Sequence, residues 1–186
     1  MIIGLTGTNA SGKTSILKYL ISKNFDHFSL SDVIRDELSQ RNLEHSRDNM
    51  RQVGNELRER YGPSVLAIRT KKKIKSSRVV IDSIRNKYEV QELRNLPDFY
   101  LIALDAPLEV RFKRAMARGR QENAMNIETF RRLEEKEKSK DSTAQNIDQC
   151  MNLADIHIYN DGSHEDLHRK IDDILKQAYP HATDLG

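Results

Sequence analysis

An eight-residue pattern near the start of the chain limits what it can fold into more than any other feature. Residues 7–14 read GTNASGKT and match G-x-x-x-x-G-K-S/T at every fixed position. The pattern follows an apolar run at residues 2–6 and opens a helical pattern at residues 13–23, the strand-loop-helix setting that the motif requires. A chance match in that setting is expected in well under about 1% of chains of this size. The sequence therefore predicts a loop that wraps around an anion.

Each residue type in this loop suits the binding of phosphates. Glycine permits the backbone conformations that turn successive N–H groups toward an anion, and the N-terminus of the following helix adds its positive end. We expect Lys13 to reach the outer phosphates of a nucleoside triphosphate and the Thr14 hydroxyl to coordinate Mg²⁺. ATP and Mg²⁺ are therefore the expected cofactors, with GTP left open as the nucleotide. The expected cofactor-binding residues of the loop are Gly7, Thr8, Asn9, Ala10, Ser11, Gly12, Lys13 and Thr14.

The rest of the chain alternates between short apolar runs and helical patterns. Its longest runs are continuous rather than alternating, which is typical of parallel strands covered by helices on both faces. The pattern predicts an α/β fold of the P-loop NTPase type, with a five-stranded parallel sheet and helices on both faces. A length of 186 residues suits about one domain, residues 1–186. The expected strands lie at residues 2–6, 25–30, 78–82, 99–105 and 155–159.

A long helical stretch separates the second and third of these runs. Residues 32–76 are too many for one crossover helix, and Gly62-Pro63 should interrupt them, so we expect three helical pieces. They would form an insert that binds the acceptor, and residues 111–140 would form a short lid. The segment 33–78 holds 12 basic and 6 acidic residues, so positive charge is concentrated there. We expect one buried face of the middle helix to be formed by Met50, Val53, Leu57 and Tyr61.

Composition narrows the class of protein and its partners. The 31 Lys and Arg residues nearly balance 28 Asp and Glu residues, which excludes a polycationic coat for nucleic acid, so nucleic acid is not an expected partner. No apolar run approaches the roughly 18 residues of a membrane helix, and no signal segment precedes the first strand, so we expect a cytoplasmic location without membrane contact. The single cysteine, Cys150, is expected to be buried in a helix. The oligomeric state stays open.

Two aspartates end apolar runs and are candidates for the Mg²⁺ site. Asp82 closes the run at 78–82 and is the first choice, because the strand that carries this acid in P-loop proteins lies beside the strand of the loop. A plain cap at the strand end is the alternative interpretation of Asp82. Asp105 closes the run at 99–105 and is better explained as the turn before a helix, because Ala106 and Pro107 follow it.

Arginines are concentrated where the carboxyl ends of the strands are expected to meet. These ends are where α/β proteins bind ligands, and Arg suits both bidentate phosphate contact and the stabilisation of a transferring phosphoryl group. Residues 111–120 hold five basic residues and no acidic one. A small-molecule kinase needs such a second anion site and a lid, whereas a hydrolase needs a residue that positions water. The candidates are Arg35, Arg85, Arg114, Arg118 and Arg120, with Arg111 as the weakest.

The segment from Asp32 to Arg35 resembles the nucleoside monophosphate kinases, in which an Asp precedes by three residues the Arg that grips the acceptor phosphate. The resemblance implies that Asp32 and Arg35 bind the acceptor. Residues 80–85 are similar to the same family's third strand, whose Asp is followed by a phosphate-binding Arg, here Arg85, although the spacing is one residue shorter and the usual Gly and Pro are absent. Asp32 has three open roles: general base, orienting group, or helix N-cap.

The second half of the chain resembles the dephospho-coenzyme A kinases. The similar segments are Leu104 to Pro107 with the arginines that follow, the acidic helix around residues 133–137, and residues 154–163. In that family the loop after the fifth strand lines the adenine of ATP. The resemblance therefore implies that Asn160 and Gly162 bind the base, and it places Arg114 among the nucleotide-binding residues.

These observations favour a Mg-ATP-dependent phosphotransferase that moves the γ-phosphate to a small phosphorylated acceptor, with a nucleoside or deoxynucleoside monophosphate as the first choice. One alternative is a dephospho-coenzyme A kinase that acts on a ribose hydroxyl. Another is a slow ATPase that serves as an RNA- or protein-binding assembly factor, for which the basic stretch at 69–78 is the supporting feature. The acceptor-binding residues would be Asp32, Arg35 and Arg85. The catalytic residues would be Lys13, Asp32, Arg85, Arg118 and Arg120.

Overall fold

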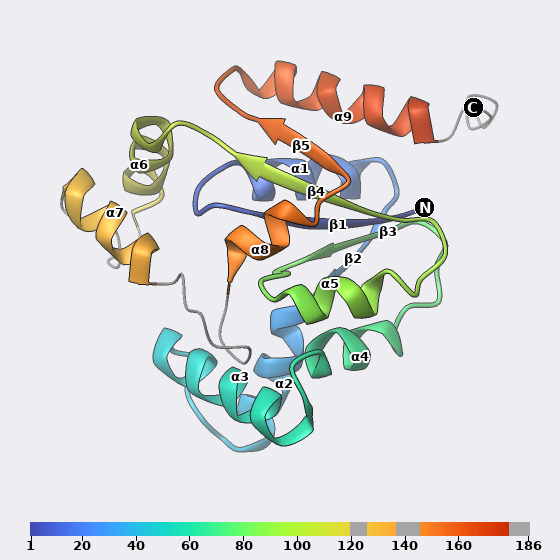
Figure 1. The fold of residues 1–186 in the computed structure, drawn as a ribbon, viewed down its shortest axis with the longest axis vertical. Helices are drawn as coiled ribbons and strands as arrows, with labels where there is room; N and C mark the ends of the chain where they lie inside the picture. The colour runs from blue at the N-terminus through green and yellow to red at the C-terminus, as the bar shows by residue number, and fades with distance from the viewer. Residues whose placement is uncertain (120–125, 137–145, 179–186) are drawn as a thin grey trace.

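Five parallel strands form the centre of the computed structural model, which describes residues 1–119, 126–136 and 146–178. Their order in the sheet is β2-β3-β1-β4-β5, so the strand that leads into the phosphate loop is central (Figure 1). All five expected strands and the parallel sheet are confirmed. The strands are β1 (Ile2–Gly7), β2 (Asp26–Ser29), β3 (Val79–Asp82), β4 (Phe99–Asp105) and β5 (Ile156–Tyr159).

Helices cover both faces of this sheet, as the continuous apolar runs predict (Figure 1). Helices α1 and α9 pack on one face, and α2, α4, α5 and α8 on the other, while α3 packs on α2 and α4. The helices are α1 (Lys13–Ser22), α2 (Leu30–Gln40), α3 (Arg47–Tyr61), α4 (Val65–Lys71), α5 (Lys87–Leu93), α6 (Leu108–Ala117), α7 (Ile127–Lys136), α8 (Ile147–Asn152) and α9 (His164–Ala178).

Two hydrophobic clusters, one on each face, hold the layers together. Successive side chains of β1 point to opposite faces, so Ile2 packs beneath α2 to α5 whereas Ile3 packs beneath α1 and α9. Both side chains are at most 4% exposed. Cys150 of α8 is buried in the first cluster, as expected for a lone cysteine, and burial raises the pKa of its thiol to about 12. This central packing fixes the carboxyl end of β1, where the phosphate loop begins, and the carboxyl end of β3 beside it.

The insert between β2 and β3 consists of the three expected helices, α2, α3 and α4. Val53 and Leu57 of α3 are buried, but Tyr61 is 49% exposed, so the expectation that it lies on the buried face is wrong. Tyr61 is the last residue of α3, before Gly62 at φ +94°, and the guanidinium groups of Arg60 and Arg69 cover its ring instead of the core. Helical periodicity is therefore a poor guide to burial at a helix end.

Helices α6 and α7 form the described part of the expected lid at 111–140. They pack on each other through the rings of Phe112 and Phe130, whose centroids are 5.8 Å apart, and Ala10 of the phosphate loop joins the same cluster. Arg120 lies outside the described residues, as does the end of the expected lid after residue 136. Of the helices in the described ranges, none combines the length and the apolar character needed to cross a membrane.

Candidate active site

The phosphate loop, residues 8–12, runs from the end of β1 to the first residue of α1. Gly7 and Gly12 have φ values of +136° and +114°, which glycine adopts without strain. A Cβ on Gly7 would lie 2.0 Å from the carbonyl oxygen of Leu104, and one on Gly12 would lie 2.3 Å from Nδ2 of Asn160. The two fixed glycines of the motif are therefore required by the close approach of β4 and of the loop after β5.

Lys13 lies inside the loop and is only partly exposed. Its Nζ donates to the carbonyl oxygens of Gly7 at 2.7 Å and Thr8 at 2.6 Å. Burial, together with the positive charges of Arg85 and Arg118, lowers the pKa of Lys13 from 10.5 to about 7, and the negative charge of Asp82 acts in the opposite direction. A group in this environment gains from any added negative charge, as an outer phosphate would provide. The lysine is thus placed to bind phosphate.

Three residues from later in the chain brace the outer side of the loop. Nδ2 of Asn160 donates to the carbonyl oxygen of Ser11 at 2.8 Å, and Nη1 of Arg114 donates to the carbonyl oxygen of Asn160 at 3.1 Å. Nη1 of Arg111 approaches the carbonyl oxygen of Asn9 at 3.5 Å and also pairs with Glu134 of α7. The structure places Asn160 and Arg114 in contact with the phosphate loop, while contact with the nucleotide itself stays a prediction.

Asp82 and Asp105 differ in how their oxygens are used. Oδ1 of Asp82 is buried and has no hydrogen-bond partner among the described residues, and Nε2 of His27 is 3.5 Å away. Oδ1 of Asp105 accepts the hydroxyl of Thr8 at 2.7 Å and the N–H of Ala106 at 2.9 Å, so it fixes the turn into α6, which is the role expected for it. A buried, unpartnered carboxylate oxygen is a fitting ligand for a cation. Binding of Mg²⁺ by Asp82 together with the exposed Thr14 stays a prediction.

The three remaining candidate arginines in the described residues fall into two groups. Arg85 and Arg118 are exposed, and both lie close enough to Lys13 for their charges to lower its pKa. Arg35 belongs to α2, the first helix of the insert. Its Nη1 donates to Oδ1 of Asp32 at 2.5 Å. Both partners of that pair are about half exposed. The N-cap of α2 is Ser29 and not Asp32, which leaves the base and orienting roles of Asp32 open.

A cluster of three serines at the ends of β2 and β3 has no counterpart in the sequence-based expectations. The hydroxyl of Ser29 donates to that of Ser83 at 3.1 Å, and the hydroxyls of Ser29 and Ser31 are 2.8 Å apart. Ser83 has a φ of +62°, which is uncommon outside glycine. Position just after a predicted strand was the available signal, because ligands of α/β proteins bind there.

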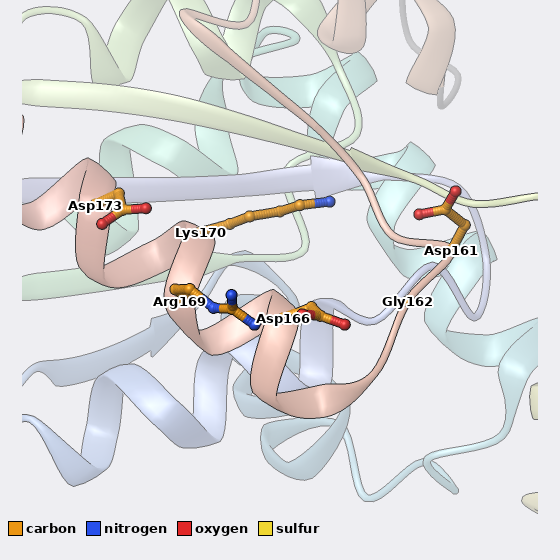
Figure 2. Close-up of a pocket in the computed structure, with 6 residues that line it drawn as sticks. All are labelled: Asp161, Gly162, Asp166, Arg169, Lys170 and Asp173. Atoms are coloured by element: carbon orange, nitrogen blue, oxygen red, sulfur yellow. Dashed lines mark hydrogen bonds and ion pairs between the residues drawn. The ribbon is translucent and has the colours of Figure 1, made fainter.

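The last expected site residue, Gly162, lies in an exposed loop between β5 and α9. It borders a shallow pocket of about 240 Å³ with Asp161 of the same loop and four residues of α9 (Figure 2). In this pocket Arg169 pairs with Asp166 at 2.6 Å, and Nζ of Lys170 donates to the carbonyl oxygen of Tyr159. Binding of a base at Gly162 stays a prediction.

The central β1, the 2-3-1-4-5 sheet order and the glycine-lysine loop before α1 define a P-loop NTPase fold. A family model described as an AAA domain matches residues 3–150. UPF0200 proteins of Thermococcus onnurineus and Methanocaldococcus jannaschii are each 30% identical to this chain over 95% of it, covering 97% and 90% of the relatives. The chain belongs to this AAA-domain family and, within it, to the UPF0200 proteins.

Another relative is longer, and solved structures share the fold. A UPF0200/UPF0201 protein of Archaeoglobus fulgidus is 34% identical over 94% of this chain, which spans about half of that protein, 54%. The crystal structure of TT1252 from Thermus thermophilus matches 95% of this chain and 97% of its own, with a TM-score of 0.60 and 20% identity. Shikimate kinase from Acinetobacter baumannii, solved with shikimate, matches 98% and 95% with a TM-score of 0.58 and 16% identity. These likenesses establish the fold.

The lowered pKa of Lys13 predicts that ATP binding weakens as the pH rises from 6.5 to 8.5. Below a pKa of about 7 the lysine is charged and attracts phosphate, whereas above it a proton must be taken up on binding. The affinity should therefore fall by up to about tenfold per pH unit in the upper part of this window. Calorimetric titration of the metal-free protein with ATP measures it. Lys13→Met is the control that reports the titration of ATP itself, and equal slopes for both proteins would contradict the assignment.

Proposed function

We propose that the protein is a phosphotransferase that moves the γ-phosphate of ATP to a small phosphorylated acceptor, first of all a nucleoside or deoxynucleoside monophosphate. The observation that carries this proposal is the gathering of positive charge around the phosphate loop. Arg85 from the β3 side and Arg118 from the end of α6 both act on Lys13, although they lie 33 residues apart in the chain. Arginines in that arrangement suit a phosphoryl group in transfer more than a water molecule held for hydrolysis.

Each residue has a distinct part in the proposed reaction. The backbone N–H groups of residues 8–13 and the N-terminus of α1 would bind the phosphates of the donor. Lys13 would turn from the carbonyl oxygens of Gly7 and Thr8 to the outer phosphates, and Arg85 with Arg118 would balance the charge on the group that moves. Thr14 and Asp82 would hold Mg²⁺, which supplies charge neutralisation between the outer phosphates. Packing of α6 and α7 beside the loop favours the exclusion of water.

The acceptor would lie between the insert and the end of β3. Arg35 lies in the middle of α2 and Arg85 lies after β3, and both side chains are exposed. Asp32, which accepts a hydrogen bond from Arg35, would orient that guanidinium toward the acceptor phosphate. Transfer to a phosphate oxygen needs positioning and charge compensation and no strong base, because the acceptor is already an anion.

Arg35→Ala is expected to raise the KM for the acceptor about 10- to 100-fold with little change in the KM for ATP, because a charge-assisted contact to the acceptor alone is lost. Steady-state kinetics with each substrate varied in turn measures this. Arg51→Ala is the matched control, since Arg51 lies in the same insert, is 71% exposed and pairs with Asp48 of its own helix, α3. An effect of Arg35→Ala confined to ATP would move Arg35 out of the acceptor site.

Transfer to a hydroxyl group is the second candidate, and the serine cluster favours it. The strand ends offer neutral hydrogen-bonding groups, the hydroxyls of Ser29, Ser31 and Ser83. Asp32 directly follows Ser31 in the chain and would serve as the base. A dephospho-coenzyme A kinase would use them on a ribose hydroxyl. The solved shikimate kinase of the same fold also carries an acceptor with hydroxyl groups.

The third candidate is a slow ATPase that serves as an RNA- or protein-binding assembly factor. Ion pairs within the basic stretch at 69–78 weaken the support for it. Three of the six basic side chains in the stretch at 69–78 pair with acidic side chains. Lys73 pairs with Asp36 at 2.8 Å, Arg69 with Glu37 at 3.4 Å, and Lys71 with Glu92. These ion pairs reduce the positive charge that the stretch offers to a polyanion.

A transfer assay with labelled ATP distinguishes the three candidates. The acceptors would be all nucleoside and deoxynucleoside monophosphates, dephospho-coenzyme A and shikimate, each tested with and without Mg²⁺. One strong monophosphate acceptor supports the first candidate, and strong transfer to a hydroxyl acceptor supports the second. ATP hydrolysis without transfer to any of them would contradict both.

A further inference from the structure

A buried ion pair beside the candidate active site has no role in the chemistry described so far. Glu89, in the first turn of α5, is 0% exposed, and Arg58 of α3 is 3% exposed. Nη2 of Arg58 donates to Oε1 of Glu89 at 3.0 Å, while Nε of Arg58 is buried and has no partner in the part of the chain that the structure describes. Burying two charges is costly, and apolar residues in their place are often neutral or stabilising. Stability alone therefore does not explain this pair.

The second oxygen of Glu89 binds the loop that follows β3. Oε2 accepts the N–H of Arg85 at 3.0 Å and the N–H of Asn86 at 3.1 Å. The bond from Asn86 belongs to the capping box that starts α5, in which glutamine serves as well as glutamate. The bond from Arg85 and the charge of Arg58 are additional to that motif. Glu89 thus joins the backbone of Arg85 to helix α3 of the insert.

The same loop, residues 83–86, is fixed from other sides as well. The hydroxyl of Thr6 in β1 donates to the carbonyl oxygen of Ile84 at 3.0 Å, and the N–H of Asn146 donates to that of Arg85 at 2.7 Å. Ser83 is held at a φ of +62°. A conformation of this kind persists only where the surroundings impose it, and it is concentrated at functional sites. What this loop presents to the phosphate loop is the exposed side chain of Arg85.

We propose that Glu89 is a positioning residue that, held by Arg58, fixes the guanidinium of Arg85 at the phosphate being transferred. The inference rests on the proposed phosphotransferase function and deepens it. Because Arg58 belongs to α3, the carboxylate of Glu89 links the acceptor insert to the backbone of Arg85. A displacement of about 1 Å in a catalytic group costs roughly 100-fold in rate, so the contact matters well beyond its share of stability.

Glu89→Gln tests the proposal because it keeps the shape and the capping box but removes the charge that Arg58 needs. We expect kcat for transfer to fall about 10- to 100-fold, with the KM for ATP changed less than about twofold. In an Arg85→Ala background the same substitution should have no further effect on kcat, since Glu89 acts through Arg85. The matched control is Glu56→Gln, which breaks the exposed pair with Arg41 in the same insert and should leave kcat unchanged.

A second variant separates positioning from stability. Arg58→Met combined with Glu89→Gln removes both charges of the buried pair. The melting temperature of the double variant should therefore be higher than that of either single variant, while its kcat stays low. Recovery of kcat together with the melting temperature would overturn the proposal. Independent, multiplying effects of Glu89→Gln and Arg85→Ala would overturn it as well.

Failure of the proposed function would look different. If the wild-type protein transfers phosphate to no acceptor, the phosphotransferase assignment fails, whereas hydrogen exchange of the amides of Arg85 and Asn86 still tests the position of the loop. Faster exchange at these two amides in Glu89→Gln, with unchanged exchange in Glu56→Gln, supports the role of Glu89. Exchange at the wild-type rate overturns it.

Discussion

Lys13→Ala is expected to lower the rate of phosphoryl transfer by about 10³-fold, the largest loss of activity that any one side chain of the site should cause. The reason is that Lys13 is the positive group inside the loop and that burial, together with the charges of Arg85 and Arg118, lowers its pKa to about 7. That unfavourable free state is relieved when phosphate binds, so the lysine contributes most strongly where negative charge accumulates. Single-turnover measurement at saturating ATP isolates the effect on the chemical step.

Lys18→Ala provides the comparison for this prediction. Lys18 belongs to the same helix α1 but is exposed, one turn beyond the phosphate loop. It should leave both the rate and the melting temperature near their wild-type values. Transfer at the wild-type rate in Lys13→Ala would remove the lysine, and with it the phosphate loop, from the proposed reaction.

Gly7→Ala is expected to lower the free energy of unfolding by about 3 kcal/mol or more. The added Cβ would lie 2.0 Å from the carbonyl oxygen of Leu104, at a φ of +136°. Both the clash and the strain fall on the backbone where β1 pairs with β4, so relief requires the separation of two central strands. Equilibrium unfolding in urea, followed by circular dichroism, measures the loss.

Gly62→Ala is the control for the contribution of strain alone. Gly62 has a φ of +94°, but no heavy atom of the described residues beyond its own chain neighbours lies within 4 Å of the Cβ position. Only the conformational preference of glycine is lost there, which should cost about 1 kcal/mol. Equal losses for the two variants would mean that the approach of β4 to the loop is unimportant.

The sheet and the phosphate loop could be predicted from the sequence because both are encoded by neighbouring residues. Continuous apolar runs mark buried parallel strands at any position, and the loop motif carries its own flanking strand and helix. The turn role of Asp105 was also readable, because Ala106 and Pro107 follow it directly. Local chemistry was sufficient wherever a residue and its partners lie within a few positions of each other.

The support of the site could not be predicted, because its contacts join distant segments. Asn160 and Ser11 are 149 residues apart, and Arg58 and Glu89 are 31 apart. No pattern around Asn160 distinguishes an amide that holds a loop from one that binds a base. Arg58 is one of several arginines in a basic insert, and its burial depends on the packing of α3. The prediction that Tyr61 is buried was wrong for a related reason, because helical periodicity does not show which residues cover the end of a helix.

The bond between Asn160 and Ser11 also has a consequence for the order in which the protein can be made. The phosphate loop is synthesised before its support, because the amide that completes its outer side follows 149 residues later. At roughly 5–20 residues per second this delay is about 8 to 30 s. During synthesis the loop therefore has its full sequence long before it has its final support, and nucleotide binding at native affinity should begin only after β5 has joined the sheet.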